Sequence, residues 1–224
     1  KDGSCLRQLL AALCAAVPAV RIRLGSLEPL TVTEEFARSL AEMPGIMRQF
    51  HLSLQSGSAA VLQRMRRRYT PEQYLQACAL LRRYMPDCAI TTDIISGFPG
   101  ETDAEFVETL AFVRQAAFAR IHAFPYSRRS GTLADRMPDQ VPEAIKHART
   151  NELIALGNQL EQNFVQGLIG SVQSVLFEQA VDENGAEGYT GQYVRVRAAA
   201  RPGEICNVRI TGAQGTLAIG EIVE

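Results

Sequence analysis

The sequence contains no tryptophan, few other aromatic residues and only five cysteines in 224 residues. The cysteines are scattered and form no CxxC pair, so no metal or cluster site is expected from this chain alone. The longest apolar run, residues 9–20, contains a proline and is shorter than the roughly 20 residues that span a bilayer. No signal-peptide pattern is found. These absences exclude a disulfide-rich secreted protein and argue against membrane association, so a cytoplasmic protein is predicted.

What is present is the composition of a globular protein, 46% hydrophobic with a formal net charge of -1. The charge is unevenly distributed, because the last 60 or so residues are acidic on balance. A dense basic run comprises Arg64, Arg66, Arg67 and Arg68. Such a run indicates either a solvated helix face or contacts with nucleic-acid phosphates.

Strand and helix patterns alternate through about residue 125. The expected strands cover residues 20–24, 50–54, 89–95 and 120–124. Helix starts are indicated by Thr31 with Glu34, by Thr70 before Pro71, and by Thr102 with Glu105. Strands joined by helical crossovers must be parallel, so this part is predicted to be α/β. A helix at residues 6–17 comes before any strand, which suggests an α/β fold whose front is missing.

A long helix is expected at about residues 143–168, and the pattern then changes. Short β-branched strands at 173–179, 189–197, 204–211 and 216–223 are separated by turns such as Glu183-Asn184-Gly185. This spacing predicts a small antiparallel, OB-like barrel. The expected domains are therefore residues 1–163 and 164–224.

The most informative segment is residues 92–102, where an apolar strand meets a glycine-rich turn that opens onto a helix. Gly97 and Gly100 permit positive φ or close approach of a ligand. A helix N-terminus at Thr102 could attract an anion. The segment lacks the Lys-Ser/Thr pair of a phosphate-binding P-loop and the spacing of a dinucleotide fingerprint. Either a ligand site or a plain tight turn remains open at this point.

Polar or small residues also follow the other strands, in segments 21–29, 51–58 and 122–132. Because α/β folds assemble their sites at the carboxyl ends of strands, these four segments together predict a shared cleft. His51 and His122 are predicted to be core residues. Asp93 lies inside an apolar strand and needs a partner, either a ligand or an arginine such as Arg21 or Arg23.

These segments resemble the radical S-adenosylmethionine methylthiotransferases, which add sulfur and a methyl group to tRNA or to a ribosomal protein. The similarity extends through residues 61–70 and covers nearly the whole chain. The strings Ser-Leu-Glu-Pro, His-Leu-Ser-Leu-Gln-Ser-Gly and Thr-Asp-Ile-Ile most resemble the branch that acts on N6-threonylcarbamoyladenosine beside the tRNA anticodon. The tail from about Phe164 resembles the family's RNA-binding TRAM barrel. The resemblance implies the C-terminal part of a TIM-like βα barrel followed by that barrel.

The chain departs from the family in its cysteines. Family members carry three cysteines in an N-terminal domain and a CxxxCxxC loop that holds a [4Fe-4S] cluster, and neither is present here. The resemblance therefore implies a C-terminal fragment that is inactive by itself. In the full-length enzyme the cofactors, S-adenosylmethionine and the clusters, carry the chemistry, so no catalytic residue is assigned in this chain.

The resemblance implies a partial S-adenosylmethionine cradle at the strand ends. Polar groups would bind ribose or methionine and apolar ones the adenine; the expected residues are Ser26, Glu28, Gln55, Ser56, Asp93, Ile95, Gly97 and Phe98. The expected tRNA contacts are Arg64, Arg66, Arg67, Arg68, Arg195 and Arg197. Tyr189 and Tyr193 could stack bases beside the last two arginines, although pairing of those arginines with Glu178 or Glu204 is an equal alternative.

Other functions remain open from the sequence. The isopentenyladenosine-tRNA and ribosomal-protein branches of the family are alternatives, as is a non-catalytic RNA-binding protein. An unrelated α/β enzyme that binds phosphate at the Thr102 helix is a further alternative. The substrate, the sulfur donor and the oligomeric state are not indicated by the sequence.

Overall fold

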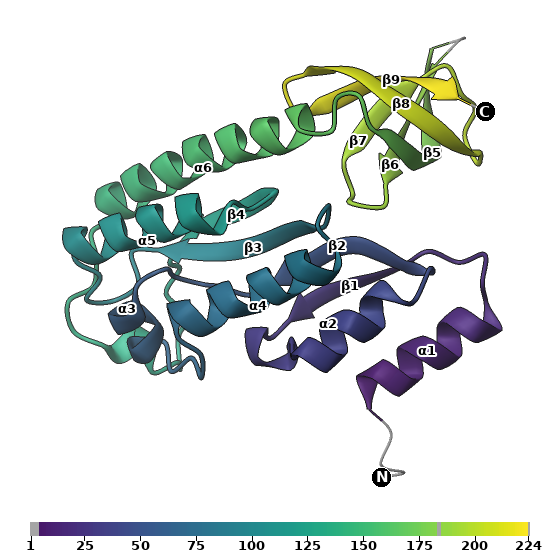
Figure 1. Ribbon diagram of the computed structural model, residues 1–224. Helices are drawn as coiled ribbons and strands as arrows, with labels where there is room; N and C mark the ends of the chain where they lie inside the picture. The colour runs from purple at the N-terminus through teal and green to yellow at the C-terminus, as the bar shows by residue number, and fades with distance from the viewer. Residues whose placement is uncertain (1–4, 183–184, 224) are drawn as a thin grey trace. The chain divides into compact units, whose positions relative to one another are not determined.

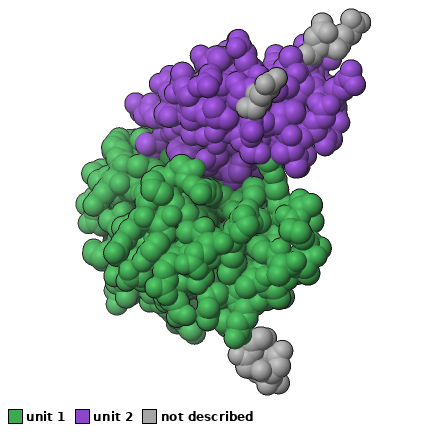
Figure 2. All heavy atoms as spheres, turned by 45° about the vertical axis from the view of Figure 1, so that its right-hand side comes forward, with its two compact units in different colours: residues 1–157 green, residues 158–224 purple. Residues whose placement is uncertain are grey.

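The computed structural model describes residues 5–182 and 185–223. The chain divides into two compact units, residues 1–157 and 158–224, which Figure 2 distinguishes by colour. The division lies within the long helix α6 (Glu143–Gln166), as does the predicted boundary after residue 163. Within the described residues, no helix combines the length and apolar character needed to cross a membrane.

The first unit is built on a four-stranded parallel sheet in the order β1-β2-β3-β4 (Figure 1). Its strands are β1 (Ile22–Leu27), β2 (Ile46–Leu52), β3 (Ala89–Ser96) and β4 (Arg120–Pro125). Its helices are α1 (Leu6–Ala16), α2 (Glu34–Ala41), α3 (Ala59–Arg64), α4 (Pro71–Tyr84) and α5 (Asp103–Ala116), with short 3-10 turns η1 (Pro29–Thr31) and η2 (Ala134–Arg136). The α/β alternation predicted from the sequence is confirmed.

Local side-chain chemistry sets the helix starts. Thr70 forms a capping box with Gln73 ahead of Pro71, and Thr102 forms one with Glu105. Prediction of Thr31 as the cap of α2 was wrong, because the cap is Thr33, whose hydroxyl accepts from the Phe36 N–H at 3.1 Å. Thr31 instead closes the short η1 turn that precedes it.

The two faces of the sheet differ in burial. On one face Phe50, Leu52 and Ile94 are fully buried, as is Tyr74 from α4. Each such side chain contributes roughly 1.5–3 kcal/mol by leaving water. On the other face, residues such as Phe124 remain half exposed.

His122 also lies on that second face. It is paired in register with Asp93 and is exposed, so the prediction that it is a core residue was wrong. A strand pattern alone does not reveal which face the helices cover.

The second unit contains a closed barrel in the order β5-β6-β7-β9-β8. Its strands are β5 (Val172–Asp182), β6 (Gly185–Thr190), β7 (Arg195–Ala198), β8 (Ile205–Gln214) and β9 (Leu217–Val223). The predicted barrel is confirmed, but one pair, β7 with β9, is parallel. The segment expected as one strand at 189–197 is two strands, and most of the predicted turn at Glu183-Asn184-Gly185 lies outside the described residues.

The barrel closes around a small apolar core that includes Phe177, Val196 and Val208, all fully buried. Gly188 permits the tight contact between β5 and β6, because a Cβ there would lie 2.1 Å from the carbonyl oxygen of Leu176. Any other residue at this position would force the two strands apart.

Candidate functional site

Three successive strands of the sheet end in a residue with left-handed backbone geometry. The φ angles are +51° at Ser26, the penultimate residue of β1, +71° at Gln55 after β2 and +70° at Gly97 after β3. Glycine adopts this conformation at no steric cost, whereas serine and glutamine do so only under strain. Strained backbone concentrated at one edge of a parallel sheet is typical of a binding site.

The backbone at Gln55 is held firmly in this conformation. Its N–H donates to the Asp93 carbonyl and its carbonyl accepts from the Ile95 N–H, both at 2.9 Å. From the other side the Tyr69 hydroxyl donates to the carbonyls of Ser53 and Leu54, at 2.7 and 2.9 Å. Burial raises the pKa of Tyr69 to about 12, so this hydroxyl remains a donor at neutral pH. The end of β2 is therefore rigid before any ligand binds.

The turn after β3 is fixed by an internal carboxylate. The Gly97 N–H donates to Glu101 Oε2 at 2.6 Å, so this amide is not free to bind a ligand. The Glu101 N–H donates to the Phe98 carbonyl at 2.9 Å and closes the turn. Phe98 is consequently held at the surface of a cavity.

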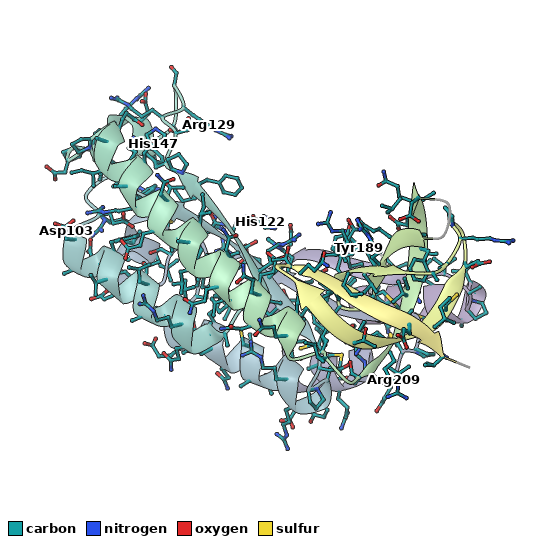
Figure 3. All side chains as sticks on the ribbon, turned by 90° about the horizontal axis from the view of Figure 1, so that it is seen from above. Asp103, His122, Arg129, His147, Tyr189 and Arg209 are labelled. Carbon is teal, nitrogen blue, oxygen red and sulfur yellow. The ribbon has the colours of Figure 1, made fainter. Side chains whose placement is uncertain are left out.

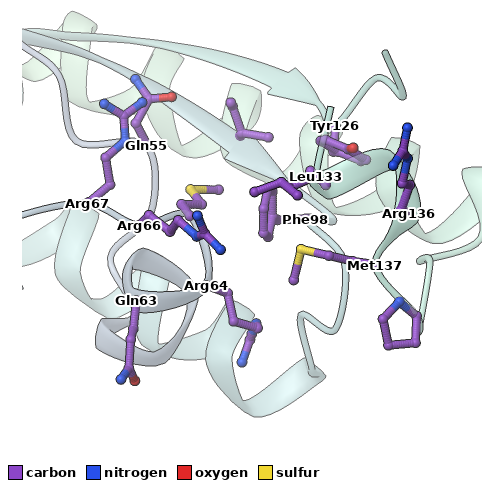
Figure 4. Close-up of a pocket in the computed structure, with 14 residues that line it drawn as sticks. Gln55, Gln63, Arg64, Arg66, Arg67, Phe98, Tyr126, Leu133, Arg136 and Met137 are labelled. Atoms are coloured by element: carbon purple, nitrogen blue, oxygen red, sulfur yellow. The ribbon is translucent and has the colours of Figure 1, made fainter. Parts of the chain in front are cut away.

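This cavity has a volume of about 710 Å³ and opens beside the strand ends (Figure 4). Both apolar and cationic side chains line it. The residues that line it are Gln55, Gln63, Arg64, Met65, Arg66, Arg67, Ile95, Phe98, Tyr126, Leu133, Ala134, Arg136, Met137 and Pro138. Figure 4 shows Arg67 and Arg136 on opposite sides, with Phe98 between them.

The arginines around the cavity differ in their partners. Arg64 makes a bidentate pair with Glu105, at 2.9 and 2.7 Å, and its hydrogen bond holds the pKa of that carboxyl below its usual range. Arg67 lies 3.8 Å from Glu28. Arg66 and Arg136 are exposed and have no carboxylate within 4 Å among the residues described. These two cations are available to an anionic ligand.

A second cavity, of about 650 Å³, adjoins the first and shares Ile95, Tyr126 and Ala134 with it. Phe124 lines this second cavity and is 52% exposed. The Tyr126 hydroxyl is buried and has no hydrogen-bond partner within the described part of the chain. A buried hydroxyl without a partner costs about 1–3 kcal/mol, which a bound ligand or water could offset.

The predicted site residues divide into two groups. Gln55, Ile95 and Phe98 line the larger cavity, as do three of the predicted RNA-binding arginines. Five others do not line it: Ser26, Glu28, Ser56, Asp93 and Gly97. Arg68 instead borders a 300 Å³ hollow beside Thr70.

Two residues of the second group have internal partners. Ser56 is fully buried, with its hydroxyl 3.2 Å from that of Thr109. Asp93 lies 3.3 Å from His51, which also contacts Thr91 at 3.1 Å. These contacts hold Ser56 and Asp93 at the strand ends, and neither side chain lines the larger cavity.

The far wall of this cavity is formed by Tyr126, Leu133, Arg136 and Met137. The sequence analysis included Tyr126 in the segment 122–132 expected at the cleft but did not single out the other three. Tyr126 follows β4 directly, and its position at a strand end was the available signal. The other three lie in and around η2, where the sequence has no periodic pattern.

In the second unit, Arg195 and Arg197 lie on one face of β7, because Val196 between them is buried. Both arginines contact Glu187, at 3.7 and 2.6 Å, and not Glu178 or Glu204, which the sequence analysis gave as alternative partners. Tyr189, which is paired in register with Arg195, stacks on Tyr193 with ring centroids 4.4 Å apart. Tyr189 is labelled in Figure 3.

Comparison with known proteins places this geometry in context. Residues 6–113 match the radical SAM superfamily. The chain is 42% identical, over 95% of its length, to a tRNA-2-methylthio-N(6)-dimethylallyladenosine synthase from Acidothermus cellulolyticus. It is 40% identical, over 84% of its length, to the threonylcarbamoyladenosine tRNA methylthiotransferase MtaB from Bacillus subtilis. The chain spans less than half of each relative, 44% and 43% of their lengths.

A solved structure agrees with these matches. Coproporphyrinogen III oxidase from Escherichia coli, a radical SAM enzyme, aligns with a TM-score of 0.57 over 92% of this chain and 51% of its own, at 14% identity. At that identity the likeness shows the fold alone. By the sequence match over residues 6–113 and the identities to the two named relatives, the chain is similar to the radical SAM superfamily and to the tRNA methylthiotransferases.

Proposed function

We propose that this chain forms the S-adenosylmethionine- and tRNA-binding part of a cytoplasmic enzyme that adds a methylthio group to an adenosine of tRNA. The observation that carries the proposal is the 710 Å³ cavity, which opens beside β2 and β3, two strands that lie within the matched range. The names of the related enzymes support a tRNA substrate. The activity is proposed for a full-length protein, because the chain spans less than half of those relatives.

The residues around the cavity fit S-adenosylmethionine, which combines an adenine, a ribose and a charged amino-acid end. Ile95 and Phe98 offer apolar surface to a flat base, and Gln55 can hydrogen-bond hydroxyl groups. Unpaired arginine charge suits a carboxylate. The volume also lies in the usual range for small-molecule sites, about 300–1,000 Å³. When bound, this cofactor supplies the radical and methyl-transfer chemistry of the family.

The residues of this chain do not fit a [4Fe-4S] cluster. Such a cluster needs several thiolates close together. Burial raises the pKa of Cys78 and of Cys88 to about 12, which disfavours the thiolate of both. Within the described ranges, no group of three or more His, Cys, Asp or Glu side chains could hold a metal. The cluster that the family implies is therefore assigned no ligand here.

The proposed roles of this chain's own residues are binding and orientation. Tyr69 and the Gln55 backbone bridge keep the end of β2 fixed, so that ordering this loop costs little when a ligand binds. Ile95 and Phe98 would set the plane of the base. Glu28 would act through Arg67, and Ser26, Ser56 and Asp93 would support the strand ends.

Within the relatives, two substrates compete: adenosine carrying a dimethylallyl group and adenosine carrying a threonylcarbamoyl group. The first substituent is uncharged and apolar, whereas the second ends in a carboxylate. Arg66 and Arg136 lack carboxylate partners in the described residues and face one cavity. Charge complementarity therefore favours the threonylcarbamoyl substrate, as did the sequence resemblance.

The test is nucleoside analysis of bulk tRNA by liquid chromatography and mass spectrometry after deletion of the gene. We expect loss of 2-methylthio-N6-threonylcarbamoyladenosine and its return with the full-length gene on a plasmid. Loss of the dimethylallyl derivative instead would refute the branch assignment. An unchanged tRNA profile would refute the proposed function.

A second experiment addresses the arginines directly. Complementation with Arg66→Gln or Arg136→Gln should restore less modified nucleoside, whereas Arg114→Gln, an exposed control on α5, should restore the full amount. Equal restoration by all three variants would remove the two cavity arginines from substrate recognition.

The remaining predicted RNA contacts are retained as part of the proposal. Arg68 and Arg67 lie where they could meet tRNA phosphates, together with Arg66. Arg64 is committed to Glu105 and would contribute mainly by holding α3 to α5. The Thr102 helix is a poor phosphate site, because its first turn already carries the negative charges of Asp103 and Glu105.

A further inference from the structure

The start of α6 buries a polar face, which is unusual in a helix. Lys146, Arg149 and Thr150 follow the helical spacing of three and four residues and are all buried within the first unit. Two of them carry a charge, and a buried charge is tolerated only with a partner. Lys146 pairs with Glu143 on α6 itself at 2.7 Å, whereas Arg149 pairs with Glu101 in the turn after β3 and with Asp103 at the start of α5.

Arg149 makes four polar or cation–π contacts. Its Nη1 donates to Glu101 Oε2 at 2.8 Å and to the Glu101 carbonyl at 3.1 Å, and its Nη2 donates to Asp103 Oδ1 at 2.7 Å. Its guanidinium carbon lies 5.4 Å from the centre of the Phe106 ring. The side chains of Arg149 and Glu101 are 8% and 1% exposed, so this pair is shielded from water.

Glu101 connects Arg149 to the ligand-facing turn. The same oxygen, Oε2, accepts from Arg149 and from the Gly97 N–H, the latter at 2.6 Å. Burial raises the pKa of Glu101, whereas the Gly97 N–H and Arg149 oppose that rise. Without Arg149, a buried carboxylate would lose its main counter-charge, and its contact with Gly97 would weaken.

The back of the turn has no spare room. A Cβ on Gly97 would lie 2.4 Å from Cγ of Lys146, and Ser96 Oγ lies 2.7 Å from Thr150 Oγ1. The turn therefore rests on α6 from behind, while Ile95 and Phe98 on either side of Gly97 line the cavity in front. A shift of Glu101 has to move the groups that face the ligand.

We propose that Arg149 is a positioning residue: through Glu101 it holds the Gly97 turn in the geometry that presents Ile95 and Phe98 to S-adenosylmethionine. This inference rests on the proposed function, because it assumes that the cavity takes this cofactor. Arg149 itself touches no ligand, and its effect passes through one carboxylate oxygen. The relevant consequence is a change in cofactor affinity beyond any loss of stability.

The experiment uses the full-length enzyme with Arg149→Met, Arg149→Lys and a control, Arg83→Met. Arg83 forms an exposed pair with Glu34, so the control removes the same charge where burial plays no part. Two quantities are measured: the KM for S-adenosylmethionine with its kcat, and the hydrogen exchange of the 97–101 backbone without cofactor.

For Arg149→Met we expect at least about tenfold faster exchange at Gly97 and at least about a tenfold rise in KM, as for loss of a charged hydrogen bond. We expect kcat to change much less, because no group that touches the reacting atoms is removed. Arg149→Lys keeps the charge and should recover part of both effects. Arg83→Met should match the wild type.

Unchanged exchange at Gly97 in Arg149→Met would show that Arg149 does not hold the turn. Faster exchange with an unchanged KM would show that the order of the turn does not matter for the cofactor. Failure of the wild type to bind S-adenosylmethionine would refute the proposed function, and the exchange rates would still decide whether Arg149 holds the turn.

Discussion

The larger cavity of the first unit and the barrel of the second unit both carry arginines, but the charges of these arginines are balanced differently. Beside the larger cavity, Arg66 and Arg136 have no carboxylate partner in the described ranges. On the barrel, Arg195 and Arg197 share Glu187. The first surface can bind an anion at once, whereas the second must first give up an internal contact. Whether an arginine already has a carboxylate partner therefore indicates more about anion binding than its positive charge alone.

The largest expected effect comes from the backbone of the cavity side. Gly97→Ala places a Cβ 2.4 Å from Lys146 and forces a residue with a side chain to a φ of +70°, so we expect a loss of about 3 kcal/mol in unfolding free energy. Gly100→Ala introduces backbone strain but no clash, because the nearest atom to the new Cβ would be 3.6 Å away. Its loss of unfolding free energy should therefore be smaller.

Gly25→Ala is the matched control, since it has open space and no positive φ. The three variants are compared by urea unfolding monitored by circular dichroism. A loss for Gly97→Ala no greater than that for Gly25→Ala would contradict the tight packing of this turn.

The two arginine pairs allow a direct comparison in tRNA binding. Arg66→Glu with Arg136→Glu should weaken binding by the full-length protein by more than about tenfold and flatten its salt dependence. Arg195→Glu with Arg197→Glu should also weaken and flatten it, but less, because Glu187 already offsets part of that charge. Filter binding at several salt concentrations provides the measurement. A larger effect of the barrel pair would reverse the comparison.

A smaller effect, an increase in tRNA affinity, is expected when Arg195 and Arg197 lose their shared partner Glu187. Glu187→Gln removes the shared carboxylate but keeps its size, so Arg195 and Arg197 become available to phosphates. We expect roughly threefold tighter tRNA binding and a steeper salt dependence. Glu178→Gln is the control for a general loss of negative charge on the barrel. Equal changes in both variants would mean that Glu187 has no special role.

The smallest expected effect concerns acid stability of the cavity side. The hydrogen bond from Arg64 lowers the pKa of Glu105, so the ionised form stabilises the fold above the pKa of an unfolded glutamate, and this contribution is lost as the pH falls through the folded value. Glu105→Gln should therefore destabilise at pH 7 more than at pH 3. Thermal unfolding at both pH values tests this, and an equal loss at each would exclude the charge as the cause.

Features that depend on neighbours in the sequence could be predicted. The caps at Thr70 and Thr102 and the positive φ at Gly97 and Gly100 follow from local residue types. The alternation of strands and helices then gave the parallel sheet and placed Gln55, Ile95 and Phe98 together. These parts of the site follow because the carboxyl ends of parallel strands meet at one edge.

Features that depend on residues far apart in the sequence could not be predicted. Arg149 and Glu101 are separated by 48 positions, and nothing in a polar helix pattern indicates that one of its charges is buried. Arg136 reaches the cavity from a loop without periodicity. Exposure of His122 depends on which face of the sheet lacks a helix, which only the assembled fold defines.

Gln55 has a consequence for how this protein could evolve or be engineered. Its backbone is strained by a side chain at a φ of +71°, yet that side chain lines the cavity. Glycine would relieve roughly 1–2 kcal/mol of strain and would remove the amide. Libraries selected only for heat resistance should therefore enrich glycine at position 55, and libraries selected for turnover should reject it. A residue under such opposed selection marks the ligand side of the fold independently of any bound molecule.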